Sequence, residues 1–202
     1  MPELSVVIPT YNRLDTLSLV LPTLLAQDLP AAQYELLVCD SSSTDGTDAY
    51  VREIAAAHPN VRYLPAAYSG RAAARNAGIA AALGEIVLFN DADIFASPNL
   101  LSVHRDRHLQ RSGIAVVGLE VQARDYKEYE YKRDHPKARG HLHPPSRKKL
   151  SWLYFLTGNA SVRRPDLLRA GCFDESFTGY GHEDLELGYR LQGLGIEICY
   201  EP

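Results

Sequence analysis

The first half of the chain alternates short apolar runs with longer segments in which apolar residues recur every three or four positions. The apolar runs, rich in Val, Ile and Leu, predict buried strands over residues 4–9, 34–39, 61–64 and 85–89. The longer segments predict helices over residues 14–25, 48–58 and 70–83. Strands and helices that alternate with short links predict an α/β fold, with a parallel sheet covered by helices on both faces.

Local signals refine the ends of these helices. Asn12 and Asp15 form a capping pattern before the first helix, and Pro22 predicts a kink in it or a later start. The polar run over residues 41–47 predicts a turn that caps the second helix. Gly84 predicts the end of the third.

The second half has a weaker pattern. It predicts helices over residues 97–112 and 183–194 and strands over residues 114–121 and 196–200, and residues 152–161 and 165–171 are given no type. His104 and His108 lie four residues apart, which is a zinc-binding spacing on a helix, but no glutamate of a zinc hydrolase stands between them. The pattern favours a solvated helix face for the two histidines.

Residues 124–149 have no clear periodicity. They hold nine Lys or Arg against four Asp or Glu, together with several tyrosines and histidines. Three interpretations stay open: a lid that closes over a bound diphosphate, a contact with an anionic acceptor or membrane surface, or a solvated, disordered insertion.

Composition limits the classes of protein. The 202 residues, 46% of them hydrophobic, suit one compact domain, with residues 1–95 as the regular half and 96–202 as the irregular half. A net charge of −4 gives no basic field for nucleic acid. With no signal sequence and no run of about 18 apolar residues, the chain is expected to be cytoplasmic, with reduced cysteines.

Carboxylates follow the predicted strands. Asp40 follows the second strand, and Asp91 and Asp93 follow the fourth. Ligands of parallel sheets bind at the carboxyl ends of the strands, and residues i and i+2 of a strand point the same way, so Asp91 and Asp93 are expected to converge on one divalent cation. A second acidic pair, Glu183 and Asp184, lies between glycines and a predicted helix. A metal-diphosphate site with a separate base is what sugar transfer from a nucleotide donor requires.

Four segments in order resemble family 2 of the inverting glycosyltransferases, whose nucleotide-sugar-binding domain has the GT-A fold. They are Val6-Val7-Ile8-Pro9-Thr10-Tyr11-Asn12-Arg13, Asp40 with Ser43-Thr44-Asp45-Gly46-Thr47, Arg75-Asn76-Ala77-Gly78 and Asp91-Ala92-Asp93. Residues 158–164 and 173–190, which include Gly181-His182-Glu183-Asp184, resemble the galactosyltransferase-like and chondroitin-polymerase-like members. The match covers most of the chain, with residues 124–149 as the main unmatched part.

The resemblance implies a donor site. Asp93 would bind Mn²⁺ or Mg²⁺ directly, and Asp91 would contact the ribose or a metal-bound water. Asp40 would accept a hydrogen bond from a uracil ring, beside Thr10 and Tyr11, and Arg71 or Arg75 would meet a phosphate, with Arg71 nearer the loop. The nucleotide-binding residues are thus Pro9, Thr10, Tyr11, Arg13, Asp40, Arg71, Arg75 and Asp91.

The resemblance also implies a catalytic and acceptor side. Asp184 would take the proton of the attacking hydroxyl, and Glu183 would orient the acceptor or the donor sugar. The acceptor, a glycan or lipid-linked hydroxyl, would lie against Gly158, Asn159, Tyr180 and His182.

Structural roles are the alternatives for these residues. Asp91 and Asp93 could cap the helix near Pro98, Asp40 could be a turn residue, and the Glu183-Asp184 pair could simply suit the positive end of a helix. A non-catalytic nucleotide-sugar-binding module and a retaining transferase are the alternative functions.

The sequence departs from the family pattern at two places. Ser41 stands where relatives commonly carry a second aspartate. A metal-binding histidine that usually follows the last strand is missing after Tyr200, so the chain is expected to be a C-terminally truncated piece of a longer protein.

Overall fold

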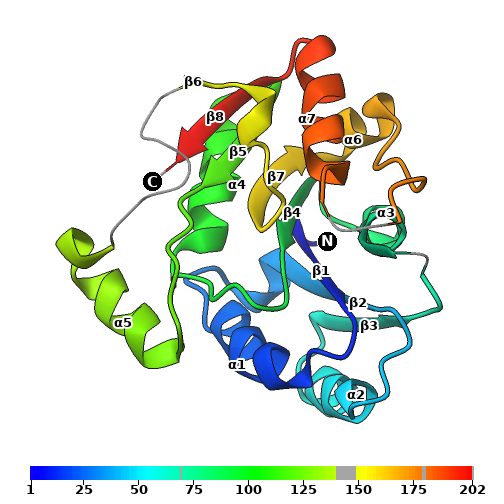
Figure 1. The fold of residues 1–202 in the computed structure, drawn as a ribbon, viewed down its shortest axis with the longest axis vertical. Coiled ribbons are helices and arrows are strands. Elements are labelled where there is room, and N and C mark those ends of the chain that lie inside the picture. Colours follow the sequence, from blue (N-terminus) through cyan, green and yellow to red (C-terminus); the bar gives the residue numbers. More distant parts are fainter. Residues whose placement is uncertain (69, 140–148, 179–180, 202) are drawn as a thin grey trace.

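A computed structural model describes residues 1–68, 70–139, 149–178 and 181–201, and Figure 1 shows one mixed sheet between two layers of helices. The strands are β1 (Leu4–Thr10), β2 (Tyr34–Asp40), β3 (Val61–Pro65), β4 (Ile86–Asn90), β5 (Ile114–Gly118), β6 (Lys149–Leu150), β7 (Asn159–Arg163) and β8 (Glu197–Glu201). The helices are α1 (Leu14–Leu25), α2 (Thr47–Ala57), α3 (Gly70–Ala81), α4 (Leu100–Gln110), α5 (Tyr126–Asp134), α6 (Arg164–Ala170) and α7 (Glu183–Gly193), with 3₁₀ turns at residues 31–33, 136–138 and 152–154.

The strand order is β3-β2-β1-β4-β7-β5-β8-β6. The first four strands are parallel, as the alternating pattern predicts, and β5 is parallel to β8. β7 is antiparallel to both β4 and β5. The start of β7 therefore meets the carboxyl ends of β4 and β5 at one edge of the sheet, which brings residues from distant parts of the chain together.

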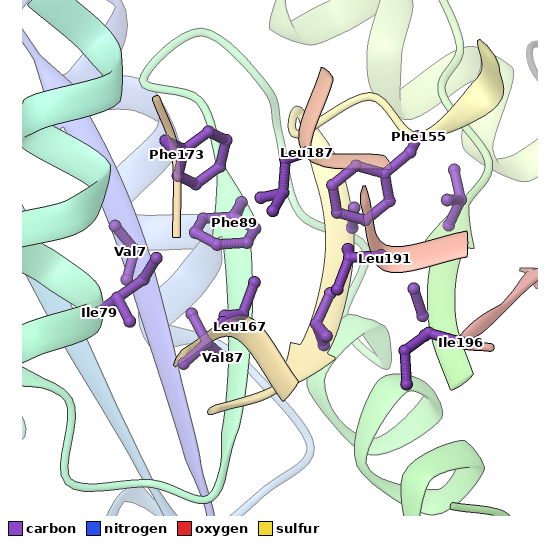
Figure 2. Close-up of a cluster of buried hydrophobic side chains, with 14 of the residues drawn as sticks. Val7, Ile79, Val87, Phe89, Phe155, Leu167, Phe173, Leu187, Leu191 and Ile196 are labelled. Atoms are coloured by element: carbon purple, nitrogen blue, oxygen red, sulfur yellow. The ribbon is translucent and has the colours of Figure 1, made fainter. Parts of the chain in front are cut away.

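Alternation along the strands divides the core into two layers. Val6 and Ile8 pack under α1, α2 and α4, while Val7 points to the other face and packs with α3, α6 and α7. Figure 2 shows this second layer around Phe89, whose ring contacts Phe173 edge to face with centroids 5.3 Å apart. Each such buried side chain contributes roughly 1.5–3 kcal/mol to stability.

Helix α3 packs closely on β1 because a glycine faces the strand. A Cβ atom at Gly78 would lie 2.4 Å from Cγ1 of Val7. The alanine-rich sequence of α3 thus serves close approach to the sheet, and it places Arg75 in the interior with 2% exposure.

Helix α1 starts at Leu14 and runs through Pro22, so the proline does not delay its start. The carbonyl of Ser18, one turn before Pro22, accepts a hydrogen bond from the hydroxyl of Tyr50. The first turn of α1 is capped from another loop, since Asp45 Oδ2 accepts the N–H of Leu14 at 2.9 Å. Asn12 does not cap α1: its Oδ1 accepts the N–H of Thr44, which joins the loops after β1 and β2.

Helix α5 lies inside the segment for which the sequence predicts no regular structure. Asp125 caps it by accepting the N–H of Glu128 at 2.8 Å, so a capping box was present in the sequence. The rings of Phe95, Tyr126 and Tyr129 pack together, and Tyr129 donates to the carbonyl of Ala96 at 2.8 Å. Figure 1 shows α5 at the edge of the molecule, away from α6 and α7.

The other predicted elements are present, although α4 and β5 are shorter than expected, whereas β6, β7 and α6 were not predicted. Over the described ranges, no helix combines the length and the apolar character that a bilayer crossing demands.

Candidate active site

The turn after β4 carries the first acidic pair. β4 ends at Asn90, so Asp91 and Asp93 lie in a turn closed by the hydrogen bond from the N–H of Ile94 to the carbonyl of Asp91, and strand alternation does not orient them. The buried Asn90 holds this turn, since its Nδ2 donates to the carbonyls of Asp91 and Ile94 at 2.9 and 3.0 Å. Neither Asp91 nor Asp93 accepts a hydrogen bond from the start of α4 in the described structure, so the capping alternative has no support.

The second acidic pair begins helix α7, as predicted. Glu183 is buried, with 3% exposure, while Asp184 is half-buried and accepts the N–H of Leu185 at 2.8 Å. Burial raises the pKa of Asp184 above its ordinary value, and the charge of Glu183 raises it further. A carboxylate with a raised pKa takes up a proton more readily, which suits a general base.

Arg75 connects the two acidic pairs. Its Nη2 lies 2.9 Å from Oδ1 of Asp91, and its Nη1 lies 2.8 Å from Oε1 of Glu183, a residue 108 positions further along the chain. Burial alone would lower the pKa of Arg75, but the two carboxylates outweigh it and the pKa is raised. The guanidinium thus stays charged and fixes the turn after β4 against the start of α7. Both of its terminal nitrogens bind protein carboxylates, and a phosphate contact by Arg75 stays a prediction.

The predicted nucleotide-binding residues gather at the ends of β1 and β2. Thr10 and Asp40 are paired in the sheet, and both are buried. Asp40 accepts hydrogen bonds from Tyr63 and from the backbone and side chain of Ser43. The hydroxyl of Thr10 is buried and has no hydrogen-bond partner in the described part of the chain. Buried polar atoms usually have such a partner, and a bound ligand could supply it.

The other nucleotide-binding candidates surround this pair. Pro9 is buried within β1, whereas Tyr11 is 60% exposed and Arg13 is exposed at the start of α1. Arg71 is exposed in the first turn of α3. Tyr11 and Arg13 follow the carboxyl end of β1, and Arg71 begins the helix that follows β3; their contacts with a nucleotide stay a prediction.

A cleft of about 1020 Å³ opens beside the turn after β4. Part of its lining, the acidic wall, includes the exposed Asp93 and Glu120, which follows β5. The lining also includes basic residues of α5 and of the segments before and after it, interspersed with two glutamates: Arg124, Lys132, Arg133 and Arg139, with Glu128 and Glu201. The cleft thus has both carboxylates and cationic side chains, a combination suited to a cation with an anionic ligand.

Glu120 is a site residue that the sequence reasoning missed. Burial, followed by the charges of Asp91, Asp184 and Asp93, raises its pKa to about 7. The signal was present in the sequence, because Glu120 follows an apolar strand as Asp40 and Asp91 do.

The acceptor-side candidates have mixed outcomes. Gly158 lies against Glu120, and Asn159 starts β7 with its side chain turned into the sheet. His182 is exposed, precedes α7 and has the left-handed backbone conformation, with φ of 78°. Tyr180 lies outside the described residues.

His104 and His108 are buried, so the prediction of a solvated helix face is wrong. Asn159 Nδ2 donates to the carbonyl of Leu119 at 3.3 Å, which leaves its Oδ1 to accept from Nε2 of His104 at 2.9 Å. Nδ1 of His104 then accepts the hydroxyl of Ser161 at 2.7 Å, and that hydroxyl oxygen accepts from Nε2 of His108 at 2.9 Å. Both histidines are neutral in this chain of hydrogen bonds, and burial lowers their pKa values to about 4 and about 3.

A divalent cation fits the acidic turn only with help from its ligand. Within the described ranges, no group of three or more His, Cys, Asp or Glu side chains converges to hold an ion. Asp93 faces the cleft, and Asp91 already binds Arg75. Hard cations take six or more oxygens, so a diphosphate and water would have to supply the rest.

Solved structures with a similar fold bind nucleotide sugars. The mannosyltransferase PcManGT from Pyrobaculum calidifontis, solved with GDP-Man and Mn²⁺, superposes with a TM-score of 0.75 and 26% identity over 100% of this chain and 55% of its own. S. aureus TarS 1–349, solved with UDP, has a TM-score of 0.76 at 21% identity over 100% of this chain and 58% of its own. The fold is therefore the GT-A fold.

Curated relatives match along nearly the full chain. Validoxylamine A glucosyltransferase of Streptomyces hygroscopicus subsp. jinggangensis is 32% identical over 98% of this chain and 53% of its own length. Chondroitin synthase of Escherichia coli is 28% identical over 98% of this chain and 33% of its own length. The chain thus spans about half the length, or less, of these two proteins.

The family model covers the donor half of the site. The model described as glycosyl transferase family 2 matches residues 5–171, which contain both acidic strand ends but not Glu183 and Asp184. The resemblance of the C-terminal segment to galactosyltransferase-like members therefore stays a prediction. With a match over most of its length, the chain belongs to glycosyl transferase family 2.

Proposed function

We propose that this protein is a metal-dependent, inverting glycosyltransferase that moves a sugar from a nucleotide diphosphate, with UDP the expected nucleotide, to a hydroxyl of a glycan or lipid-linked acceptor. The observation that carries the proposal is the double ion pair of Arg75. It ties Asp91 to Glu183, so the predicted metal and base residues lie at one edge of the sheet.

The donor would bind across the ends of β1, β2 and β4. Asp40 and Thr10 offer buried hydrogen-bonding groups for the base, with Tyr11 exposed beside them. Asp93 would bind Mn²⁺ or Mg²⁺, and Asp91 would contact the ribose or a metal-bound water. The cation would neutralise the charge of the leaving diphosphate.

Asp184 would act as the general base. The acceptor oxygen attacks the anomeric carbon, its proton passes to Asp184, and the bond from that carbon to the diphosphate breaks with its electron pair leaving on the nucleotide. A single displacement inverts the configuration. Glu183, held by Arg75, would keep the start of α7 in position and orient the sugar or acceptor.

The relatives support a nucleotide-sugar donor but differ in its nucleotide, since one solved neighbour holds GDP-Man and another holds UDP. UDP stays the expected nucleotide because the carboxylate of Asp40 could accept the N–H of uracil; guanine also presents N–H groups, so GDP is titrated in parallel. A location in the cytoplasm, at the inner face of a membrane if residues 124–149 contact lipid, stays a prediction.

The decisive experiment is calorimetric titration of UDP, and in parallel GDP, with Mn²⁺ and then with chelator. Wild-type protein should bind UDP only with the metal, and Asp93→Ala should lose that binding. Asp106→Ala, which removes an exposed carboxylate on α4, should bind as the wild type does. Metal-independent binding, or equal binding by Asp93→Ala, would contradict the metal assignment.

Turnover separates the proposal from its alternatives. A non-catalytic module would bind UDP and metal but transfer no sugar to any acceptor. A retaining transferase would give a product with the donor's anomeric configuration, which NMR of the product distinguishes from inversion.

A further inference from the structure

Glu120 has no role in the mechanism above, although it lies at the centre of the acidic wall. It follows β5 at the same edge of the sheet as Asp91, and it lines the cleft together with Asp93. Its Oε1 atom is buried and has no hydrogen-bond partner in the described structure. A buried, unpaired carboxylate oxygen is destabilising, and the nearby charges of Asp91, Asp93 and Asp184 add repulsion.

The surrounding backbone holds Glu120 in this unfavourable place. A Cβ atom at Gly158 would lie 2.7 Å from Oε1 of Glu120 and 2.5 Å from Cδ1 of Ile94, so a larger residue at this position would displace the ends of both side chains. Asn159 fixes the preceding carbonyl of Leu119, and its own amide oxygen is held by His104. The carboxylate therefore packs against Gly158, and the backbone just before it is held by β7.

The missing partner is a hydrogen-bond donor. A cation shared with Asp91 and Asp93 is a poor fit, since no three carboxylates converge within the described residues. Sugar hydroxyls are neutral donors, and the two oxygens of one carboxylate can accept from two hydroxyls on adjacent ring carbons. A hydroxyl donor in the cleft would bind the carboxylate of Glu120 from its cleft side without adding negative charge to the acidic wall.

The place of Glu120 identifies which sugar it would meet. If Asp93 holds the diphosphate through a metal and Asp184 faces the attacking hydroxyl, the transferred ring lies between them, and Glu120 is close enough to both to feel their charges. We propose that Glu120 is a specificity-determining residue that accepts hydrogen bonds from ring hydroxyls of the sugar carried by the nucleotide donor. This inference rests on the proposed function.

The test compares donor with nucleotide. UDP, UDP-glucose, UDP-galactose and UDP-N-acetylglucosamine, with GDP and GDP-mannose in parallel, are titrated with Mn²⁺ into wild type, Glu120→Gln and Glu120→Asp. For whichever sugar nucleotide the wild type binds, both variants should lose about 10- to 100-fold in affinity, while affinity for the bare nucleotide changes less than about twofold. Gln exchanges an acceptor oxygen for a donor, and Asp withdraws both oxygens by one methylene.

A matched control and a stability readout separate recognition from folding. Glu53→Gln removes an exposed carboxylate on α2, which does not line the cleft, and should leave all these affinities unchanged. Glu120→Gln should unfold at the same temperature as the wild type or higher, because it relieves repulsion. A lower unfolding temperature would mean that Glu120 has a structural role, and would overturn the inference.

The outcomes distinguish this inference from the proposed function. Equal loss of UDP and UDP-sugar affinity in Glu120→Gln would assign the residue to the metal or nucleotide and overturn the inference alone. Unchanged affinity for every ligand would do the same. A wild-type protein that binds neither nucleotide nor sugar nucleotide would overturn the proposed function, and the inference with it.

Discussion

The sheet has two halves whose interiors are held together differently. From β3 to β4 the interior is mainly aliphatic, and the buried polar residues Ser5, Thr10, Glu35 and Asp40 lie at or near the ends of β1 and β2. From β4 to β5 the interior contains Asn90, His104, Ser161 and the Arg75–Glu183 pair. Apolar packing is the larger contribution in the first half, whereas hydrogen bonds and ion pairs between distant residues are more prominent in the second. The chemistry is expected where the buried polar groups are.

The largest expected effect is on catalysis at the polar half. Asp184→Asn keeps the shape of the side chain but removes the base, so the transfer rate should fall by about 10²- to 10⁴-fold while donor affinity is kept. Steady-state rates with saturating donor measure this. Glu186→Gln, two residues further along α7 and paired with Arg190, is the matched control. Transfer by Asp184→Asn at the parental rate would show that the base lies elsewhere.

The ion pairs of Arg75 should dominate the stability of the polar half. Arg75→Met leaves the buried Glu183 without its cation and should cost about 3–5 kcal/mol in the free energy of unfolding, measured with urea. The double variant Arg75→Met with Glu183→Gln should recover part of the loss, because the uncompensated charge is gone. Arg52→Met, which breaks an exposed pair on α2, should cost less than about 1 kcal/mol. Equal costs for Arg75→Met and Arg52→Met would remove the contrast between the halves.

The buried histidines should make the polar half sensitive to acid. In the folded state the pKa of His108 is lowered to about 3. Below about pH 6.5 the unfolded chain therefore binds a proton at His108, whereas the folded chain leaves His108 neutral until the pH approaches 3. The stability from neutral His108 is thus complete above pH 6.5 and is lost as the pH falls towards 3. Wild type should lose up to about 1.4 kcal/mol per pH unit more than His108→Gln between pH 6 and 4.5. Glu120, whose pKa is raised, has the opposite effect on stability, but it is present in both wild type and His108→Gln and cancels in the comparison. Parallel plots of unfolding free energy against pH for the two proteins would contradict the assignment of a neutral, buried His108.

The smallest effect is expected in the packed half. Gly78→Ala adds a methyl group against Val7 and should cost about 1–3 kcal/mol by overpacking, with the transfer rate per folded molecule unchanged. Gly193→Ala is the control, since nothing lies within 4 Å of its Cβ position at the end of α7. A change in transfer rate for Gly78→Ala would show that packing in this half also shapes the site.

The packed half was predictable because its strands and helices are indicated by residues that lie close together in the sequence. Apolar runs and turn residues predict β1 to β4 and α1 to α3 with ends shifted by only a few residues, and Glu183 starts α7 as expected. The antiparallel direction of β7 was not predictable in this way, because it depends on a connection through α5 and the segment after it. Helix α5 itself was missed although its capping box was visible.

The site was predictable only as far as carboxylates at strand ends allow. Asp91, Asp93 and Asp184 were assigned to the site from their sequence context, and that assignment stays a prediction; the pairing of Asp91 with Glu183 through Arg75 joins residues far apart in the chain and was not foreseen. Asp91 lies in a turn and not in a strand, so the strand alternation that predicted a common direction for Asp91 and Asp93 does not apply to them. His104 and His108 were predicted to be surface residues because the group that hydrogen-bonds to both in the interior, the hydroxyl of Ser161, lies 57 and 53 positions away in the sequence.

The insertion of β7 between β4 and β5 has a consequence for biosynthesis. During translation β1 to β4 emerge in sequence, and their parallel pairing is complete once Asn90 has been made. The outer edge of β4 then has unpaired backbone groups until residues 159–163 emerge from the ribosome. Such an edge pairs readily with other chains, so the nascent protein is expected to need protection during this interval. Stalled chains ending before residue 159 should therefore bind chaperones or aggregate more than chains that include β7, and equal behaviour of the two would contradict this.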